Sequence, residues 1–235
     1  MKPELIVALD VPESSLIPGI VNSLPNEISF YKVGLELFTS EGPKALEFLK
    51  NNNKQIFLDL KLHDIPKTVE NAVKTAAKHG VSLLTVHAMG GRNMLQAAAN
   101  AAAECEKPPK IVAVTTLTSL DETDFSDLGI NRKISEQAQM LGGIAISSGI
   151  DGLVTSVHEV EMLRNTFGDQ AILVTPGIRP SGGEVADQKR VATPEMAVNK
   201  GSSHLVVGRP ILQAADPNAA ALQILEEMNA AYSGE

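Results

Sequence analysis

Eight short runs of apolar and β-branched residues recur along the 235-residue chain, and their spacing limits the folds that it can adopt. They occupy residues 5–9, 29–33, 56–60, 82–86, 111–115, 152–155, 172–175 and 205–207. Most are separated by segments rich in Ala, Leu, Glu and Lys with helical spacing, such as 67–79, 93–103 and 134–148. Alternation of strands and helices predicts parallel strands joined by crossovers. Eight such units favour an α/β fold of the closed (β/α)8 type, a TIM barrel, over an open sheet.

The barrel is expected to form one catalytic domain over residues 1–235, because no Gly/Ser-rich or Pro-rich linker divides the chain. Apolar residues make up 43% of the chain and charged residues 20%, a balance that provides a sizeable core and suggests neither a disordered nor a membrane protein. The net charge of −8 argues against broad nucleic-acid binding but permits a small anionic ligand. The first apolar run is too short for a signal sequence or a spanning helix, so a cytoplasmic protein is expected.

Function in such barrels is sought at the C-terminal ends of the strands, where their active sites lie. Charged side chains are concentrated at four of the eight expected ends. Two connections after strands are unusually long, 116–132 and 176–193, and are candidate lids. The polar residues at the strand ends therefore form the candidate site.

The third run contains the pair Asp59 and Lys61, which alternation places on one face of a strand together with Phe57. The apolar residues at 56, 58 and 60 take the other face, which helices should cover. Asp59 and Lys61 must then look into the barrel mouth, where buried charges need a partner or a use. A plain ion pair that closes the top of the barrel is the structural alternative.

Asp10 and Lys32 end the first two runs and should project toward the same mouth. With Asp59, Lys61 and Asp64 they are expected to form a chain of alternating negative and positive groups. The sequence Asp-Val-Pro-Glu that begins at Asp10 is also typical of a helix cap, which is the alternative for this residue. A lysine inside a buried strand has little structural reason to be there, so Lys32 favours a functional interpretation.

The last run leads into Gly208 and Arg209, a turn in which glycine lets backbone N–H groups approach an anion and arginine can bind it. The loops after strands seven and eight are the usual phosphate site of such barrels. Arg179 and Gln188, on the long loop after the seventh strand, are expected to reach the same phosphate. For Gln188 a solvated loop position is the alternative, and for Arg209 a surface ion pair.

These residues resemble those of a known family, orotidine 5′-phosphate decarboxylase of the bacterial type. The resemblance is carried by Asp59-x-Lys61-x-x-Asp64-Ile-Pro-Lys-Thr68, by Ala-Leu-Asp10 and Lys32-Val-Gly before it, and by Pro176-Gly-Ile-Arg179-Pro and Val-Gly208-Arg209-Pro after it. The motifs occur in the family's order over nearly the whole chain. Related barrels that act on sugar phosphates share the Asp-x-Lys-x-x-Asp core, whereas the extension through Ile65 and Thr68 is more specific.

The resemblance implies loss of CO2 from orotidine 5′-phosphate and protonation of the base carbon to give uridine 5′-phosphate (UMP), the last step of de novo pyrimidine nucleotide synthesis. Lys61 would stand beside the developing carbanion and donate the proton. Asp59, Lys32 and Asp64 would hold Lys61 in place, with Asp59 near the substrate carboxylate. No metal or cofactor would take part.

The resemblance also implies how the nucleotide is bound and that the protein is a homodimer with composite active sites. Asp10 and Lys32 would bind ribose hydroxyls, as would Asp64 and Thr68 from a second subunit, and Thr118 would border the pyrimidine. The implied substrate-binding set is Asp10, Lys32, Asp59, Asp64, Ile65, Thr68, Thr118, Pro176, Arg179, Gln188, Gly208 and Arg209.

Two other functions fit parts of the pattern. One is a metal-dependent sugar-phosphate lyase or epimerase on the same barrel, with Asp59, Asp64 and His87 as ligands. The other is a nucleotide sensor that keeps the phosphate site without the chemistry. A sensor needs Arg209 but has no need for Asp59 and Lys61 at the mouth.

Overall fold

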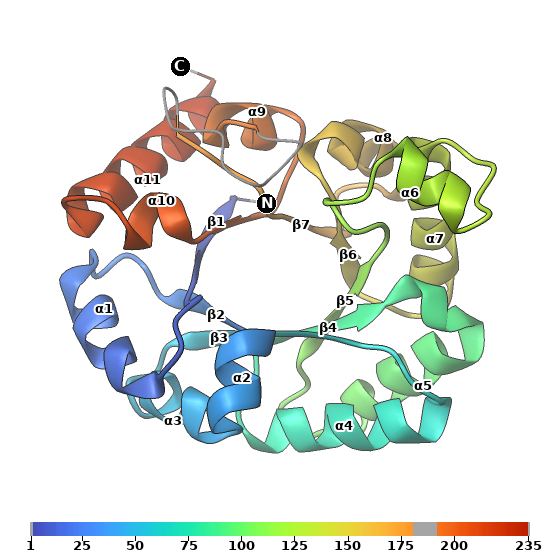
Figure 1. Ribbon diagram of the computed structural model, residues 1–235, viewed down its shortest axis with the longest axis horizontal. Helices are drawn as coiled ribbons and strands as arrows, with labels where there is room; N and C mark the ends of the chain where they lie inside the picture. The colour runs from blue at the N-terminus through green and yellow to red at the C-terminus, as the bar shows by residue number, and fades with distance from the viewer. Residues whose placement is uncertain (1, 181–191, 235) are drawn as a thin grey trace.

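The computed structural model describes residues 2–180 and 192–234, and within them eight parallel strands close into a barrel (Figure 1). Each strand pairs with the next along the chain, and the last returns to the first. All eight expected runs form strands; the largest difference is at the third, which continues to Leu62 instead of ending at 60. The strands are β1 (Glu4–Ala8), β2 (Phe30–Gly34), β3 (Gln55–Leu62), β4 (Leu83–His87), β5 (Lys110–Val114), β6 (Gly152–Val154), β7 (Ile172–Thr175) and β8 (His204–Val207).

A ring of helices covers the outside of the barrel (Figure 1). The expected helices at 67–79, 93–103 and 134–148 are present as α4, α5 and α7. Within the described residues no helix is both long enough and apolar enough to cross a membrane. The helices are α1 (Ile17–Ser23), α2 (Leu35–Glu41), α3 (Lys44–Asn51), α4 (Pro66–Lys78), α5 (Gly91–Ala103), α6 (Glu122–Asp127), α7 (Ile134–Ser147), α8 (Val157–Phe167), α9 (Pro194–Asn199), α10 (Arg209–Leu212) and α11 (Pro217–Ser233), with short 3₁₀ turns η1 (Ser14–Leu16) and η2 (Ala88–Gly90).

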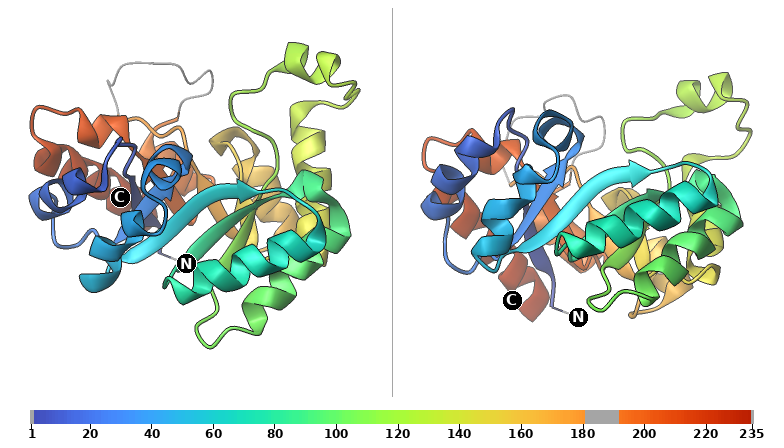
Figure 2. Two further views of the ribbon diagram at one scale, coloured as in Figure 1. Left: turned by 60° about the horizontal axis from the view of Figure 1, so that its bottom comes forward. Right: turned by 90° about the horizontal axis from the view of Figure 1, so that it is seen from below.

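The two long connections differ. The first contains α6, which stands away from the barrel at one end of the molecule (Figure 2). Asp121 caps this helix through its carboxylate, which accepts hydrogen bonds from the amides of Thr123 and Asp124. Most of the second connection, residues 181–191, lies outside the described residues.

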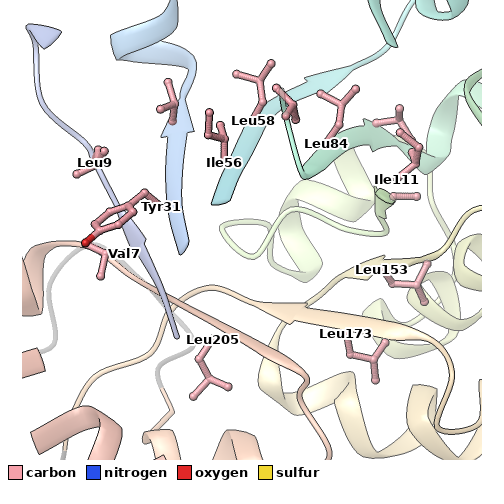
Figure 3. Close-up of a cluster of buried hydrophobic side chains, with 14 of the residues drawn as sticks. Val7, Leu9, Tyr31, Ile56, Leu58, Leu84, Ile111, Leu153, Leu173 and Leu205 are labelled. Carbon is pink, nitrogen blue, oxygen red and sulfur yellow. The ribbon is translucent and has the colours of Figure 1, made fainter. Parts of the chain in front are cut away.

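Two apolar layers lie on opposite sides of the strands, as the alternation of side chains along each strand requires. The outer layer fills the space between strands and helices, and Figure 3 shows its members turned away from the barrel axis. The inner layer fills the barrel itself and consists of Ile6, Ala8, Phe30, Phe57, Leu83, Val112, Val174 and Val206. The barrel is therefore packed with side chains below its mouth.

The inner rows of side chains continue upward into polar residues. Ala8 of the inner layer is followed two positions later by Asp10, and Phe30 is followed by Lys32. Because alternation has a period of two, these charged groups share the inward direction of the apolar residues below them. The packed layer thus forms the floor on which the charged groups stand.

His204 closes the opposite end of the barrel, where it is 7% exposed. Its ring meets the ring of Phe30 edge-on, with centroids 5.9 Å apart, and Nδ1 is hydrogen-bonded to the Ser203 hydroxyl at 2.9 Å. Burial lowers the pKa of His204 to about 4, because the charged imidazolium would lose its water.

This burial makes the stability of the fold depend on pH. In the unfolded chain the ordinary pKa of a histidine is about 6.5, so the unfolded state binds more protons than the folded state as the pH falls below that value. The free energy of unfolding should then fall by about 3 kcal/mol between pH 6.5 and pH 4 on account of His204 alone.

We expect His204→Asn to flatten this part of the stability curve, as measured by urea unfolding at pH 7, 5.5 and 4. His158→Asn, which removes an exposed histidine from α8, is the matched control and should follow the wild-type curve. A His204→Asn curve as steep as that of the wild type would contradict the assignment.

Candidate active site

A cavity of about 250 Å³ opens at the barrel mouth, at the C-terminal ends of the strands. Larger hollows of about 500 and 560 Å³ lie beside the start of β1 and at the end of α4, away from the strand ends where such barrels carry their sites. Eleven of the mouth cavity's lining residues are Asp10, Lys32, Phe57, Asp59, Lys61, Thr118, Pro176, Gly177, Arg179, Gly208 and Arg209. Nine of these were expected site residues; Phe57 and Gly177 were not.

Four charged side chains from three neighbouring strands form a chain of alternating sign. Lys32 Nζ lies 2.9 Å from Asp10 Oδ1 and 4.0 Å from Asp59 Oδ2, and Lys61 Nζ lies 2.9 Å from Asp59 Oδ1. Lys32 and Asp59 at its centre are 11% and 16% exposed, whereas Asp10 at one end is 50% exposed. Two positive and two negative groups together carry no net charge, which offsets part of the cost of removing them from water.

Glycines leave the space that this chain of charges occupies. A Cβ atom on Gly34, at the end of β2, would lie 2.9 Å from Lys32 Nζ. One on Gly208, after β8, would lie 3.1 Å from Asp10 Oδ2. Gly208 therefore packs against the charged cluster, in addition to the role beside an anion that was expected of it.

Lys61 sits at an irregularity in β3. The register to β4 pairs Leu58 with Leu84 but Leu62 with Val86, so β3 advances four residues while β4 advances two. Lys61 has a φ of 52°, in the left-handed region that few non-glycine residues adopt. The simple alternation expected for this run predicts the inward direction of Lys61 but not this backbone.

Thr85 of β4, which sequence reasoning did not single out, occupies the irregularity. Its hydroxyl accepts a hydrogen bond from the Lys61 amide at 2.8 Å and donates one to Asp59 Oδ1 at 3.0 Å. Thr85 is fully buried. The available signal was a polar residue between the apolar Leu84 and Val86, at the inward position two residues after Leu83.

The alternative role of Asp10 as a helix cap is not observed. The first helical turn after β1, η1, begins at Ser14 with Glu13 before it, and no side chain caps it. Asp10 is instead hydrogen-bonded to Lys32.

Arg179 and Arg209 line the cavity and follow β7 and β8. An isolated bridge pairs Ile178 with Ala192, and within it the Arg179 amide donates to the Ala192 carbonyl at 2.9 Å. This bridge ties the two ends of the β7 connection together beside the cavity. Gln188, the other residue expected to bind phosphate, lies outside the described residues.

Asp64, Ile65 and Thr68 are exposed and are not among the residues that line the cavity. Asp64 Oδ1 accepts a hydrogen bond from the Ile65 amide at 2.7 Å, and within the described residues Asp64 makes no ion pair with the other four charged groups. Ile65 exposes 67% of its surface. The expected chain of five charges is therefore a chain of four in this structure.

His87 ends β4 and stacks on His63, with ring centroids 5.4 Å apart. Its Nδ1 accepts a hydrogen bond from the Met89 amide. Burial lowers its pKa, and so, to a smaller degree, do His63 and Lys61. Over residues 2–180 and 192–234, no three His, Cys, Asp or Glu side chains gather as metal ligands would, so His87 does not join Asp59 and Asp64 in such a group.

Comparison with known proteins places these features in a family context. The model of the orotidine 5′-phosphate decarboxylase / HUMPS family matches residues 3–224. The chain is 46% identical over 231 residues to an orotidine 5′-phosphate decarboxylase of Nostoc sp., covering 96% of this chain and 97% of that protein. It is 45% identical to the one of Moorella thermoacetica, covering 97% and 92%. The crystal structure of the enzyme from Lactobacillus acidophilus matches with a TM-score of 0.85 and 39% identity, over 97% of this chain and 99% of that one.

Proposed function

Because the chain belongs to the orotidine 5′-phosphate decarboxylase / HUMPS family, we propose that it converts orotidine 5′-phosphate to UMP and CO2 in a cytoplasmic step of pyrimidine synthesis, without a metal or cofactor. The observation that carries the proposal is the position of Lys61. Its ammonium is paired with Asp59 in a cavity that Arg179 and Arg209 also line. A cationic reaction centre and two arginines suited to a phosphate thus line one cavity.

Lys61 supplies what the reaction needs. When the bond between the base and the carboxylate breaks, CO2 leaves and the electron pair stays on the base carbon. A fixed ammonium aimed at that carbon stabilises the negative charge without reorganisation. One Nζ proton then moves to the carbon, and neutral Lys61 regains a proton from water.

Asp59 and Lys32 position Lys61. Asp59 accepts hydrogen bonds from Lys61 Nζ and from Thr85 on the same oxygen, and its other oxygen faces Lys32 Nζ. These contacts support an ordering role for Asp59. A substrate carboxylate beside Asp59 would add a like charge, and its departure as CO2 would relieve the repulsion.

The rest of the nucleotide is assigned to the two sides of the mouth. Asp10 and Lys32 bind the ribose hydroxyls, and Thr118 borders the pyrimidine. The phosphate is bound by Arg179, Gln188, Gly208 and Arg209. The phosphate is remote from the reacting carbon, so its binding energy can orient the base over Lys61.

The protein acts as a homodimer in which Asp64, Ile65 and Thr68 complete the site of the other subunit. All three are exposed and stand outside the cavity of their own chain. Ile65, at the start of α4, is 67% exposed, so contact with a second protein surface would remove its apolar side chain from water.

The reaction and the role of Lys61 can be tested together. Wild-type protein should consume orotidine 5′-phosphate in the presence of a chelator, and the loss of orotate absorbance measures this consumption. Lys61→Ala should remove nearly all turnover and keep UMP binding, because the amine acts in the transition state. Inhibition by the chelator would point to a metal-dependent enzyme, and UMP binding without wild-type turnover would point to a sensor.

Substitution of Arg209 tests the phosphate site. Arg209→Ala should lower kcat/KM for orotidine 5′-phosphate by about 10- to 100-fold, the effect of a lost charged hydrogen bond. It should barely change kcat/KM for orotidine, which lacks the phosphate. The two values of kcat/KM are the measurement. Arg92→Ala, at an exposed arginine that binds Ser147 on α7, is the control. Equal losses for both substrates would remove Arg209 from the phosphate site.

Mixing of two inactive variants tests whether the two subunits share each active site. Inactive Lys61→Ala and inactive Asp64→Ala subunits should complement each other on mixing, because a mixed dimer has one site with both native residues. With free exchange half the dimers are mixed and half of their sites are intact, so activity should return to about a quarter of wild type. No recovery, with exchange shown by native mass spectrometry, would mean that Asp64 serves its own chain.

A further inference from the structure

We propose that Thr85 is a positioning residue for the decarboxylation: its hydroxyl fixes both the backbone and the ammonium of Lys61. The inference rests on the proposed function for its catalytic meaning, and on the contacts of Thr85 for its geometry. Thr85 belongs to β4 and has no place among the residues that line the cavity. It therefore acts through Lys61 and Asp59.

The hydroxyl of Thr85 has a fixed orientation. Asp59 is a carboxylate, which only accepts, so the single hydroxyl proton of Thr85 points to Asp59 Oδ1 at 3.0 Å. A lone pair then faces the Lys61 amide, which donates to Oγ1 at 2.8 Å. The bond from the Lys61 amide lies in the short part of the normal N–H···O range, the bond to Asp59 lies at the long end of the O–H···O range, and Thr85 is fully buried.

The backbone of Lys61 needs this acceptor. In a regular parallel pair the amides of β3 would donate to carbonyl groups of β4, but the register shift between Leu58 and Leu62 interrupts that ladder. The Lys61 amide takes the Thr85 side chain instead. A left-handed φ on a lysine is unfavourable and persists only where the surroundings hold it.

The side chain of Lys61 is fixed by the same group. Asp59 Oδ1 receives both the Thr85 hydroxyl and Lys61 Nζ, the latter at 2.9 Å. Thr85 thus holds the oxygen on which the ammonium rests and the amide from which the side chain starts. Loss of the hydroxyl should let Lys61 drift by a fraction of an ångström or more, and an error of about 1 Å can cost about 100-fold in rate.

Two substitutions separate the hydroxyl from the shape of the residue. Thr85→Val keeps the branched shape and removes both hydrogen bonds, and Thr85→Ser keeps the hydroxyl and loses a methyl group. We expect Thr85→Val to lower kcat for orotidine 5′-phosphate by about 10- to 100-fold, with the affinity for UMP within about threefold of wild type. Thr85→Ser should retain most of the wild-type kcat.

Thr155→Val is the matched control. Thr155 follows β6, is fully buried, and its hydroxyl has no hydrogen-bond partner within the described residues. The same chemical change there should leave kcat near wild type. A drop in kcat for Thr155→Val equal to that for Thr85→Val would mean that such substitutions act through a non-specific loss of packing in the barrel. That result would overturn the proposal.

Amide hydrogen exchange tests the geometry without any turnover. The Lys61 amide, measured by NMR or by mass spectrometry of the 57–62 segment, should exchange faster in Thr85→Val than in wild type and in Thr85→Ser. Faster exchange with a reduced kcat and unchanged UMP affinity supports the proposal. Wild-type kcat in Thr85→Val, or equal losses of kcat and UMP affinity, overturns it. Failure of the wild type itself to turn over orotidine 5′-phosphate would overturn the proposed reaction, whereas the exchange result would still judge the contacts of Thr85.

Discussion

The carboxylate of Asp59 is the group on which the arrangement of the barrel mouth depends. Three side chains from three strands meet it: Lys32 of β2, Lys61 of β3 and Thr85 of β4. At 16% exposure it has little water to satisfy it, so it requires these partners. In turn it holds two ammonium groups close together that would otherwise repel each other.

The inner apolar layer makes that arrangement possible. Phe30, Phe57 and Leu83 fill the barrel below the charged groups and keep water from approaching them from beneath. Because the side chains alternate along each strand, the residues two positions further on are Lys32, Asp59 and Thr85. The same alternation that packs the core therefore also turns these polar groups inward, above the apolar layer.

The irregularity in β3 is the point at which the packing of the barrel gives way to the requirements of the site. A regular strand would carry Lys61 in an extended conformation, paired with β4 through the backbone. The extra residues replace that pairing with a side-chain hydrogen bond, and they give Lys61 a left-handed φ that is unfavourable by itself. Strain of this kind is concentrated at functional sites in proteins, where surrounding contacts hold it in place.

The sequence by itself determined the eight strands, the inward direction of Asp10, Lys32, Asp59 and Lys61, and the family, because these follow from local periodicity and from motifs. It did not determine how β3 and β4 align, since register depends on contacts between residues more than 20 positions apart, such as Lys61 and Thr85. The separation of Asp64 from the other four charges is likewise tertiary: past the end of β3 the period of two no longer applies, so the chain's path alone decides where Asp64 points. Periodicity fixes the direction of a side chain within a strand, whereas only the folded barrel fixes which groups it meets.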